Sequence, residues 1–189
     1  MTPCTCTCTC TFTRYDEEGF LFIGGRQKEI IVTGGGENVA PVPIEDMIKV
    51  QMKDIISNCM VLGDKRKHLA CIITLRTVLD AANQPTDALH PDVVAWGEEL
   101  GLEAETVTGL LEEDNEEVRL EVMAQIQKVN RKAISNAQKV HKFMIAPRDF
   151  SLPGGELTPT MKLKRHFVME MYEKKIDQMY EHETQSSMW

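Results

Sequence analysis

The chain lacks a long hydrophobic run and lacks a basic excess. No apolar stretch approaches the roughly 20 residues that a transmembrane helix needs, and the first residues do not show the basic-then-apolar order of a secretory signal. There are 21 Lys and Arg against 29 Asp and Glu, so the formal net charge is -8. This charge argues against a nucleic-acid-binding protein, which normally has a basic face. We therefore expect a cytoplasmic protein that binds no nucleic acid, although a local basic site for phosphates is compatible with the charge.

Cysteine is sparse outside the N-terminus, where Cys4, Cys6, Cys8 and Cys10 alternate with threonine. Alternating thiolates can share metals, but no histidine or second cysteine cluster completes a site of the usual spacing. We therefore predict no metal site and interpret residues 1–14 as a low-complexity, disordered tail. Cys59 and Cys71 lie in apolar runs, and we interpret them as small core residues rather than a disulfide.

Residues 15–181 are expected to form one domain, with 182–189 as a frayed terminus. The apolar runs 20–23 and 30–32 predict two strands joined in an N-terminal hairpin. Three glycines follow, and then a helix that begins near Pro41. Its predicted inner face comprises Ile44, Met47, Ile48 and Met52, with an ion pair between Glu45 and Lys49.

The rest of the chain mixes strands and helices without regular alternation. Runs 55–62 and 69–76 predict an antiparallel, central pair of strands. A helical insert at about 80–136 is expected to contain a loop at 83–87, then helices at 91–101, 106–111 and 116–134. A strand at 142–145, an irregular arm at 149–165 and a helix at 165–180 follow, with Phe167, Met171, Tyr172, Ile176 and Met179 facing inward. This order predicts an α+β fold: a small, mainly antiparallel sheet with flanking helices.

The three consecutive glycines Gly34, Gly35 and Gly36 match no phosphate-binding motif. A P-loop needs Gly-Lys-Ser/Thr at its end, which residues 37–39 do not supply. A dinucleotide fingerprint needs a glycine where Val39 stands. Two interpretations remain open: a surface that a ligand or another backbone approaches closely, and a flexible turn.

Basic residues mark two further candidate positions. Arg26 and Lys28 lie in a predicted turn, where arginine suits bidentate contact with phosphate. Lys162 precedes the last helix together with Lys164 and Arg165. Basic residues at a helix start oppose the helix dipole, so we expect an acidic partner unless they only solubilise the surface.

These segments resemble the C-terminal domain of acyl-adenylate-forming enzymes. The resemblance rests on segments 16–20, 25–32, 35–39 and 43–45, and segment 158–165 resembles the terminal lysine motif of long-chain acyl-CoA synthetases. Segments 56–58, 63–67, 135–139 and 150–157 are similar to the bubblegum-type branch. Together they extend over about residues 16–180, in the order that the family has.

The resemblance implies a two-step reaction that uses ATP, Mg²⁺ and CoA. A long-chain fatty acid and ATP give an acyl-adenylate, and CoA then displaces AMP to form the thioester. By motif position, Arg26 would contact the nucleotide, Lys28 would be the hinge, and Gly35 and Gly36 would line the CoA tunnel. Lys162 would be the catalytic lysine of adenylation. Met161 stands where many relatives have glycine.

The large N-terminal adenylation domain of these enzymes has no counterpart in the sequence. That domain would bind ATP and the acyl group, so we expect a fragment of a fatty acid–CoA ligase that is inactive alone. The alternative is a non-catalytic binding or regulatory module derived from the same domain. By resemblance, the partners are the adenylation domain and its substrates, and peripheral contact with the endoplasmic reticulum or another membrane stays open.

Overall fold

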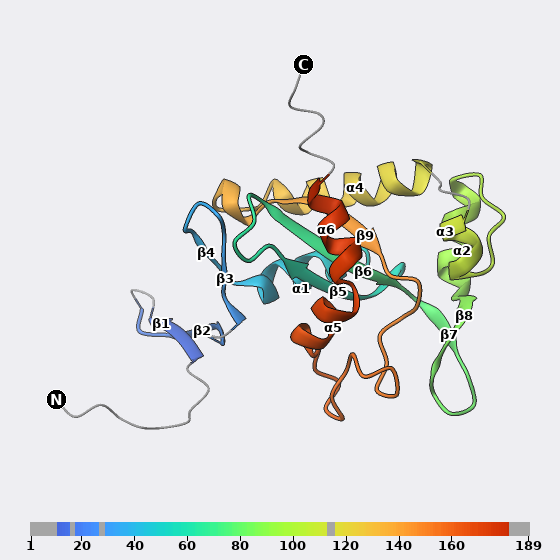
Figure 1. Ribbon diagram of the computed structural model, residues 1–189, viewed down its shortest axis with the longest axis horizontal. Coiled ribbons are helices and arrows are strands. Elements are labelled where there is room, and N and C mark those ends of the chain that lie inside the picture. Colours follow the sequence, from blue (N-terminus) through green and yellow to red (C-terminus); the bar gives the residue numbers. More distant parts are fainter. Residues whose placement is uncertain (1–10, 16–17, 27–28, 113–115, 182–189) are drawn as a thin grey trace, which may run out of the picture.

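The computed structural model describes residues 11–15, 18–26, 29–112 and 116–181 (Figure 1). At its centre, a sheet has the strand order β5 (Ile56–Leu62), β6 (Leu69–Leu75) and β9 (Val140–Ile145). The β5–β6 pair is antiparallel and β9 is parallel to β6. Every residue of β6 is buried. The predicted antiparallel pair and the α+β class are therefore confirmed. Of the two strands expected to be central, β6 is central, whereas β5 is at an edge of the sheet.

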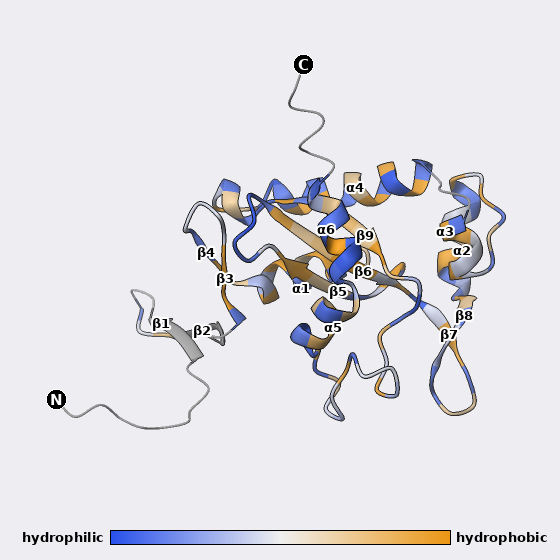
Figure 2. Ribbon diagram, viewed as in Figure 1, coloured by the Kyte–Doolittle hydropathy of each residue, from blue (hydrophilic) through white to orange (hydrophobic). Residues whose placement is uncertain are grey.

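Helices cover both faces of this sheet. Because side chains alternate along a strand, Cys59 and Val61 pack toward α1 (Pro41–Gln51) and α4 (Glu116–Asn130). Met60 and Leu62 pack instead toward α5 (Arg165–Met171) and α6 (Glu173–Glu181). Figure 2 shows the apolar residues concentrated in the sheet between these helices. Burying one such aliphatic side chain contributes about 1.5–3 kcal/mol, so two apolar layers hold the domain together.

The cysteine interpretation is confirmed for the two residues that the structure describes. Cys59 and Cys71 are free and buried on the same side of the sheet. A side-chain hydrogen bond between them, reinforced by burial, raises the pKa of the Cys59 thiol well above its usual value. The Cys59 thiol is therefore kept protonated, and both cysteines belong to the core.

Helix α1 begins as predicted, with Pro41 in its first turn. It buries Ile44 and Ile48, and Met52, the residue after its end, is also buried. The predicted ion pair between Glu45 and Lys49 is wrong. Lys49 pairs with Asp46, at 3.2 Å between Nζ and Oδ1. Glu45 is instead buried, because its carboxylate is turned toward the sheet.

The predicted hairpin between runs 20–23 and 30–32 is wrong. Strand β2 (Leu21–Arg26) pairs with β1 (Thr11–Tyr15), whereas β3 (Ile31–Val32) pairs with β4 (Asn38–Val39). Strand β1 begins inside the segment expected to be disordered, since alternating Thr, Phe and Tyr favour a strand. The alternating cysteines of residues 1–10 and the terminus 182–189 lie outside the described residues.

The insert contains a hairpin that the sequence analysis missed. Strands β7 (Thr77–Leu79) and β8 (Pro85–Leu89) pair where a loop at 83–87 was expected. Helices α2 (Pro91–Glu99) and α3 (Val107–Glu112) follow as predicted. Helix α4 ends at Asn130, whose buried side chain bonds both backbone groups of Val140. This contact ends the helix four residues before the predicted boundary at 134.

The predicted single helix at 165–180 is divided into α5 and α6 at Tyr172. Val168, Tyr172 and Ile176 are buried and face the sheet. Phe167 and Met171 were expected to face inward, but each is 39% exposed. At the start of the helix, the inward-facing residue is thus Val168 rather than the predicted Phe167.

Candidate functional site

The three glycines lie in a tight turn, Thr33–Glu37, that joins β3 to β4; we call it the glycine turn. Thr33 N donates to Glu37 O at 3.0 Å and Gly36 N donates to Thr33 O at 2.8 Å. Glu37 N donates to the Thr33 hydroxyl oxygen at 3.2 Å. Gly36 has φ +79°, in the left-handed region that favours glycine. The turn is therefore a hydrogen-bonded loop with a defined backbone conformation.

The glycines differ in what surrounds them. Gly34 N donates to Arg66 O at 2.7 Å, and a Cβ at this position would lie 3.1 Å from that same oxygen. No heavy atom of the described residues would lie within 4 Å of a Cβ at Gly36, and only the Thr33 hydroxyl would be near one at Gly35, at 3.9 Å. Gly34 thus permits a close backbone approach, whereas Gly35 and Gly36 form a surface without side chains.

Lys162 ends a second tight turn, Thr158–Lys162, which we call the lysine turn. Thr158 N donates to Lys162 O at 2.8 Å, and Met161 N donates to Thr158 O at 2.8 Å. Lys162 N donates to the Thr158 hydroxyl oxygen at 3.0 Å. The Lys162 side chain is exposed. The turn therefore fixes the backbone of Lys162 and leaves its ammonium group accessible.

The lysine turn closes a short hairpin, residues 156–164, which we call the lysine hairpin. Leu157 pairs with Leu163, and Lys164 N donates to Glu156 O at 2.8 Å. The Glu156 side chain is fully buried. One carboxylate oxygen accepts from Arg148 at 2.7 Å, and the other accepts from Ser151 N at 3.3 Å. The first strand of the hairpin thus begins at Glu156, whose carboxylate is held by Arg148 and Ser151.

The other end of the hairpin leads into α5 at Arg165, which forms a two-bond ion pair with Glu45. The distances are 2.7 Å from Nη1 to Oε1 and 2.5 Å from Nη2 to Oε2. The pair also contacts β5: Val61 N donates to Glu45 Oε1 at 2.7 Å, and Arg165 Nη1 donates to Val61 O at 3.3 Å. An acidic partner was expected for the basic residues Lys162, Lys164 and Arg165. That partner is Glu45, and it binds Arg165.

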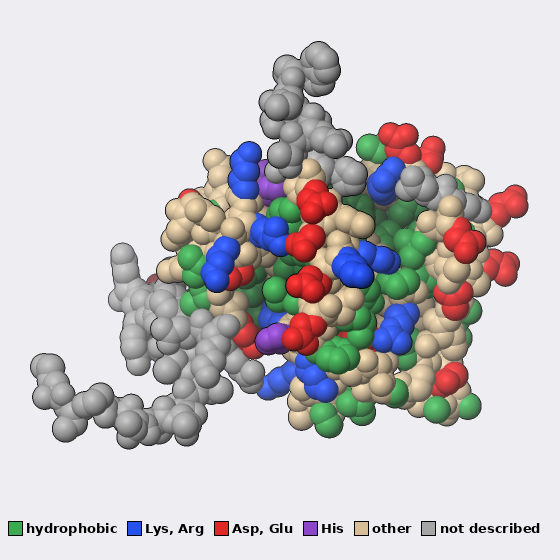
Figure 3. Space-filling model, viewed as in Figure 1, with side chains coloured by type: hydrophobic (Ala, Val, Ile, Leu, Met, Phe, Trp, Pro, Cys, Tyr) green, Lys and Arg blue, Asp and Glu red, His purple; other side chains and the backbone are tan. Residues whose placement is uncertain are grey.

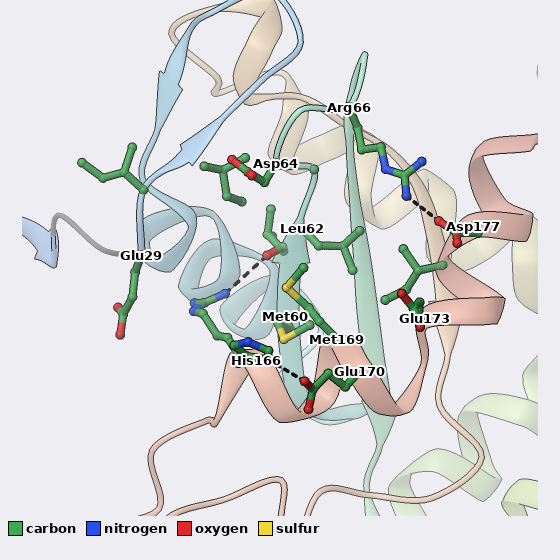
Figure 4. A pocket seen from close by; sticks show the side chains of 16 residues that line it. Glu29, Met60, Leu62, Asp64, Arg66, His166, Met169, Glu170, Glu173 and Asp177 are labelled. Carbon is green, nitrogen blue, oxygen red and sulfur yellow. Dashed lines mark hydrogen bonds and ion pairs between the residues drawn. The ribbon is translucent and has the colours of Figure 1, made fainter.

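A groove of about 770 Å³ lies beside this ion pair (Figure 4). Met60 and Leu62 from β5 line it, together with Ile176 from α6. An ion pair between Arg66 and Asp177 lies beside it, and His166 Nδ1 lies 3.3 Å from Glu170 Oε1. On the face drawn in Figure 3, acidic side chains form a column over α5 and α6. The groove therefore has an apolar floor and a mixed-charge rim, and it adjoins residues 29–31.

The structure does not bring all the predicted site residues together. In Figure 1 the β3–β4 turn and the segment between β9 and α5 lie on different sides of the domain. Arg26 ends β2, and the structure describes only its backbone. Lys28 lies outside the described residues. Within the described ranges, no group of three or more His, Cys, Asp or Glu side chains is placed to hold a metal.

Sequence reasoning missed the residues that fix the lysine hairpin. Glu45 and Glu156 are buried carboxylates. Glu45 contacts Arg165, which is far away in the sequence, and Glu156 contacts Arg148, which is nearer. The one local signal was Glu45, an acidic residue between the apolar positions of an otherwise inward helix face. Nothing near Glu156 in the sequence identifies its partner.

A sequence profile of the AMP-binding enzyme C-terminal domain matches residues 28–100 and 98–184 of this chain. The chain belongs to this family. Long-chain-fatty-acid–CoA ligase ACSBG2 of Xenopus laevis is 44% identical over 169 residues, which cover 89% of this chain and 23% of the relative. Long-chain-fatty-acid–CoA ligase ACSBG1 of Mus musculus is 44% identical over 173 residues, 91% of this chain and 24% of the relative. The resemblance to the bubblegum-type branch is therefore confirmed.

Solved structures show the same fold for this AMP-binding C-terminal domain. The A domain of carboxylic acid reductase from Segniliparus rugosus, in complex with AMP and a carboxylic acid, has a TM-score of 0.63 and 18% identity. The match covers 89% of this chain and 24% of that one. The chain thus spans about a quarter of the length of the proteins it matches. No helix in the described ranges is both long and apolar enough to cross a membrane.

Proposed function

We propose that this chain acts as the C-terminal domain of a long-chain fatty acid–CoA ligase, together with an adenylation domain that binds ATP, Mg²⁺ and the fatty acid. The family match and the names of the relatives support the reaction class. The observation that carries the proposal is the position of Lys162: an exposed lysine at the end of a hydrogen-bonded turn on an anchored hairpin. Such a residue can enter the active site of another domain in a defined orientation.

The first step requires a cation between two anions. A fatty carboxylate must approach the α-phosphate of ATP, and two unit charges at 4 Å repel by roughly 4 kcal/mol at an effective dielectric of 20. The Lys162 ammonium would lie between them, offset this repulsion and orient the carboxylate for attack. Pyrophosphate leaves and the acyl-adenylate forms. Arg26 would contact the nucleotide.

The second step uses the other side of the domain. We propose that Lys28 is the hinge about which the domain turns after adenylation. The glycine turn would then face the pantetheine arm of CoA, which is thin and needs a surface without side chains. Gly35 and Gly36 have the open surroundings that this role requires. The CoA thiolate attacks the acyl carbonyl, and AMP leaves.

The location follows from the substrates. We propose that the domain works in the cytoplasm, with peripheral contact of the whole ligase at the endoplasmic reticulum or another membrane, since long-chain fatty acids partition into lipid. This part of the proposal rests on substrate chemistry alone.

The proposal is tested with Lys162→Ala in a complete ligase. Residues 28–184 of this chain would replace the matching segment of a bubblegum-type relative. We expect acyl-adenylate formation, followed as ATP–pyrophosphate exchange with palmitate, to fall about a hundredfold or more. Thioester formation from supplied acyl-adenylate and CoA should change by less than about threefold.

Lys164→Ala is the matched control, because it removes the same charge two residues away. It should leave both half-reactions near the level of the unsubstituted ligase. The 189-residue chain alone serves as the blank. If Lys162→Ala leaves both half-reactions unchanged, the role assigned to Lys162 is wrong.

A further inference from the structure

Each end of the lysine hairpin is anchored by a carboxylate–guanidinium pair: Glu156 with Arg148, and Arg165 with Glu45. We propose that Glu156 and Arg165 are positioning residues, which act through the hairpin to place Lys162 for adenylation. The inference rests on the proposed function of Lys162. It adds two residues that do not themselves touch substrate.

The geometry of Lys162 has to come from the hairpin. Within the part of the chain that the structure describes, its hydrogen bonds to Thr158 involve only its backbone. The side chain is exposed, so no packing fixes where the ammonium group lies. Its position is therefore set by the direction in which residues 156–164 leave the domain.

Glu156 fixes the first strand of the hairpin through three bonds. Its two carboxylate oxygens accept separately from Arg148 and Ser151 N, and its backbone oxygen accepts from Lys164 N. The site has no spare room, since a Cβ on Gly154 would lie 2.1 Å from Glu156 Oε2. The two donors contact different carboxylate oxygens, and a glutamine would place an NH2 group, itself a donor, opposite one of them. A side chain with two acceptor oxygens thus fits the two donors.

Tyr172 lies in the same cluster and shows how the buried charge is balanced. Burial raises the pKa of the Tyr172 hydroxyl, and Glu156 adds to the rise, while Arg148 opposes it. An unpaired carboxylate in such a place is strongly destabilising. Arg148 therefore provides the partner that the buried Glu156 carboxylate needs.

Arg165 fixes the second strand. It follows Lys164 directly, and its guanidinium forms parallel bonds to both oxygens of the buried Glu45. A third bond reaches Val61 O of β5. A lysine keeps the charge but cannot form this planar arrangement of bonds. Since Lys162 is three residues away, a shift of Arg165 moves the lysine turn.

The inference is tested with Glu156→Gln and Arg165→Lys in the same complete ligase. A displacement of about 1 Å at a reacting group can lower a rate about a hundredfold, and we expect each variant to lower kcat for adenylation about tenfold. The KM for ATP and the thioester half-reaction should stay within about twofold. Asp177→Asn is the matched control, because it breaks a carboxylate–guanidinium pair with Arg66 that lies outside the hairpin.

A combination with Lys162→Ala separates positioning from general damage. If both residues act through Lys162, neither variant lowers adenylation further once Lys162 is alanine. An equal loss in both half-reactions, or an added loss on the Lys162→Ala background, contradicts the inference. A silent Lys162→Ala would overturn the proposed function itself. Full adenylation by Glu156→Gln and Arg165→Lys, with Lys162→Ala impaired, would overturn only the positioning role.

Hydrogen exchange on the full 189-residue chain gives a readout without catalysis. The amides of Lys162 and Lys164 donate within the hairpin. In Glu156→Gln and Arg165→Lys they should exchange at least about tenfold faster, while the amides of β6 stay as protected as in the unsubstituted chain. Unchanged exchange at Lys162 and Lys164, or equal acceleration in β6, would contradict a role confined to the hairpin.

Discussion

The glycine turn and the lysine turn have the same hydrogen bonds but different residues at the strained position. In both, the first N–H bonds the fifth C=O, the fourth N–H bonds the first C=O, and a threonine hydroxyl accepts the fifth N–H. The left-handed residue is Gly36 in one turn and Met161, with φ +58°, in the other. The same turn conformation thus occurs at the residues proposed for both steps of the reaction, and only the lysine turn has backbone strain.

A third turn, Asp80–Gln84 between β7 and β8, extends the comparison. It repeats the same bonds, with the Asp80 carboxylate in place of the threonine hydroxyl. Its left-handed residue is Asn83, with φ +59°. Glycine adopts this conformation without strain, asparagine is tolerated, and other residues are destabilised by about 1–2 kcal/mol. Met161 is 70% exposed, so little packing offsets its strain.

The largest expected difference between the turns is functional. Gly35→Leu places a side chain on the open surface of the glycine turn. In the complete ligase, thioester formation from supplied acyl-adenylate should fall about tenfold or more, because the pantetheine arm loses its path. ATP–pyrophosphate exchange should stay within about twofold, the reverse of the pattern for Lys162→Ala. Unimpaired thioester formation would remove the glycine turn from the second step.

Within the glycine turn, Gly34 and Gly35 should differ in stability. Gly34→Ala forces a Cβ against Arg66 O, and we expect the free energy of unfolding to fall by about 2 kcal/mol. Gly35→Ala meets only ordinary contacts and should change it by less than about 0.5 kcal/mol. Urea denaturation of the 189-residue chain measures both. Equal effects would mean that the approach of the Arg66 carbonyl does not require glycine at 34.

Two opposite substitutions test the strain at Met161, and they have the smallest expected effects. One introduces this strain into the glycine turn, and the other relieves it in the lysine turn. Gly36→Met should lower the free energy of unfolding by about 1 kcal/mol or more, because it introduces the left-handed strain that the lysine turn already contains. Met161→Asn should raise it by about 0.5 kcal/mol, since asparagine adopts this conformation more readily. The same denaturation experiment is sufficient. A destabilising Met161→Asn would show that the methionine side chain stabilises the turn.

Elements with strong local signals were predictable from the sequence. Pro41 and the apolar spacing after it define α1, and the dense apolar runs define β5 and β6. The lysine motif and the glycine segment were sufficient for the family. These signals lie within single segments, so they can be read without knowing the fold.

Strand partners and buried ion pairs were not predictable in the same way. Runs 20–23 and 30–32 both look like strands, but each pairs with a segment that the sequence analysis did not predict to be a strand. Glu45 was assigned to Lys49 one helical turn away, whereas its partner is 120 residues distant. Local spacing ranks nearby partners first, and only the folded sheet brings Arg165 to Glu45.

The ion pair between Glu45 and Arg165 has a consequence for association between copies of this chain. Strand β5 is at an edge of the central sheet, where unpaired backbone groups can recruit a strand from another molecule. At Val61 the N–H and C=O are already bonded to Glu45 and Arg165. A strand from a second copy would have to displace this pair. The residues that anchor the lysine hairpin thus also occupy backbone groups of an apolar edge strand at Val61.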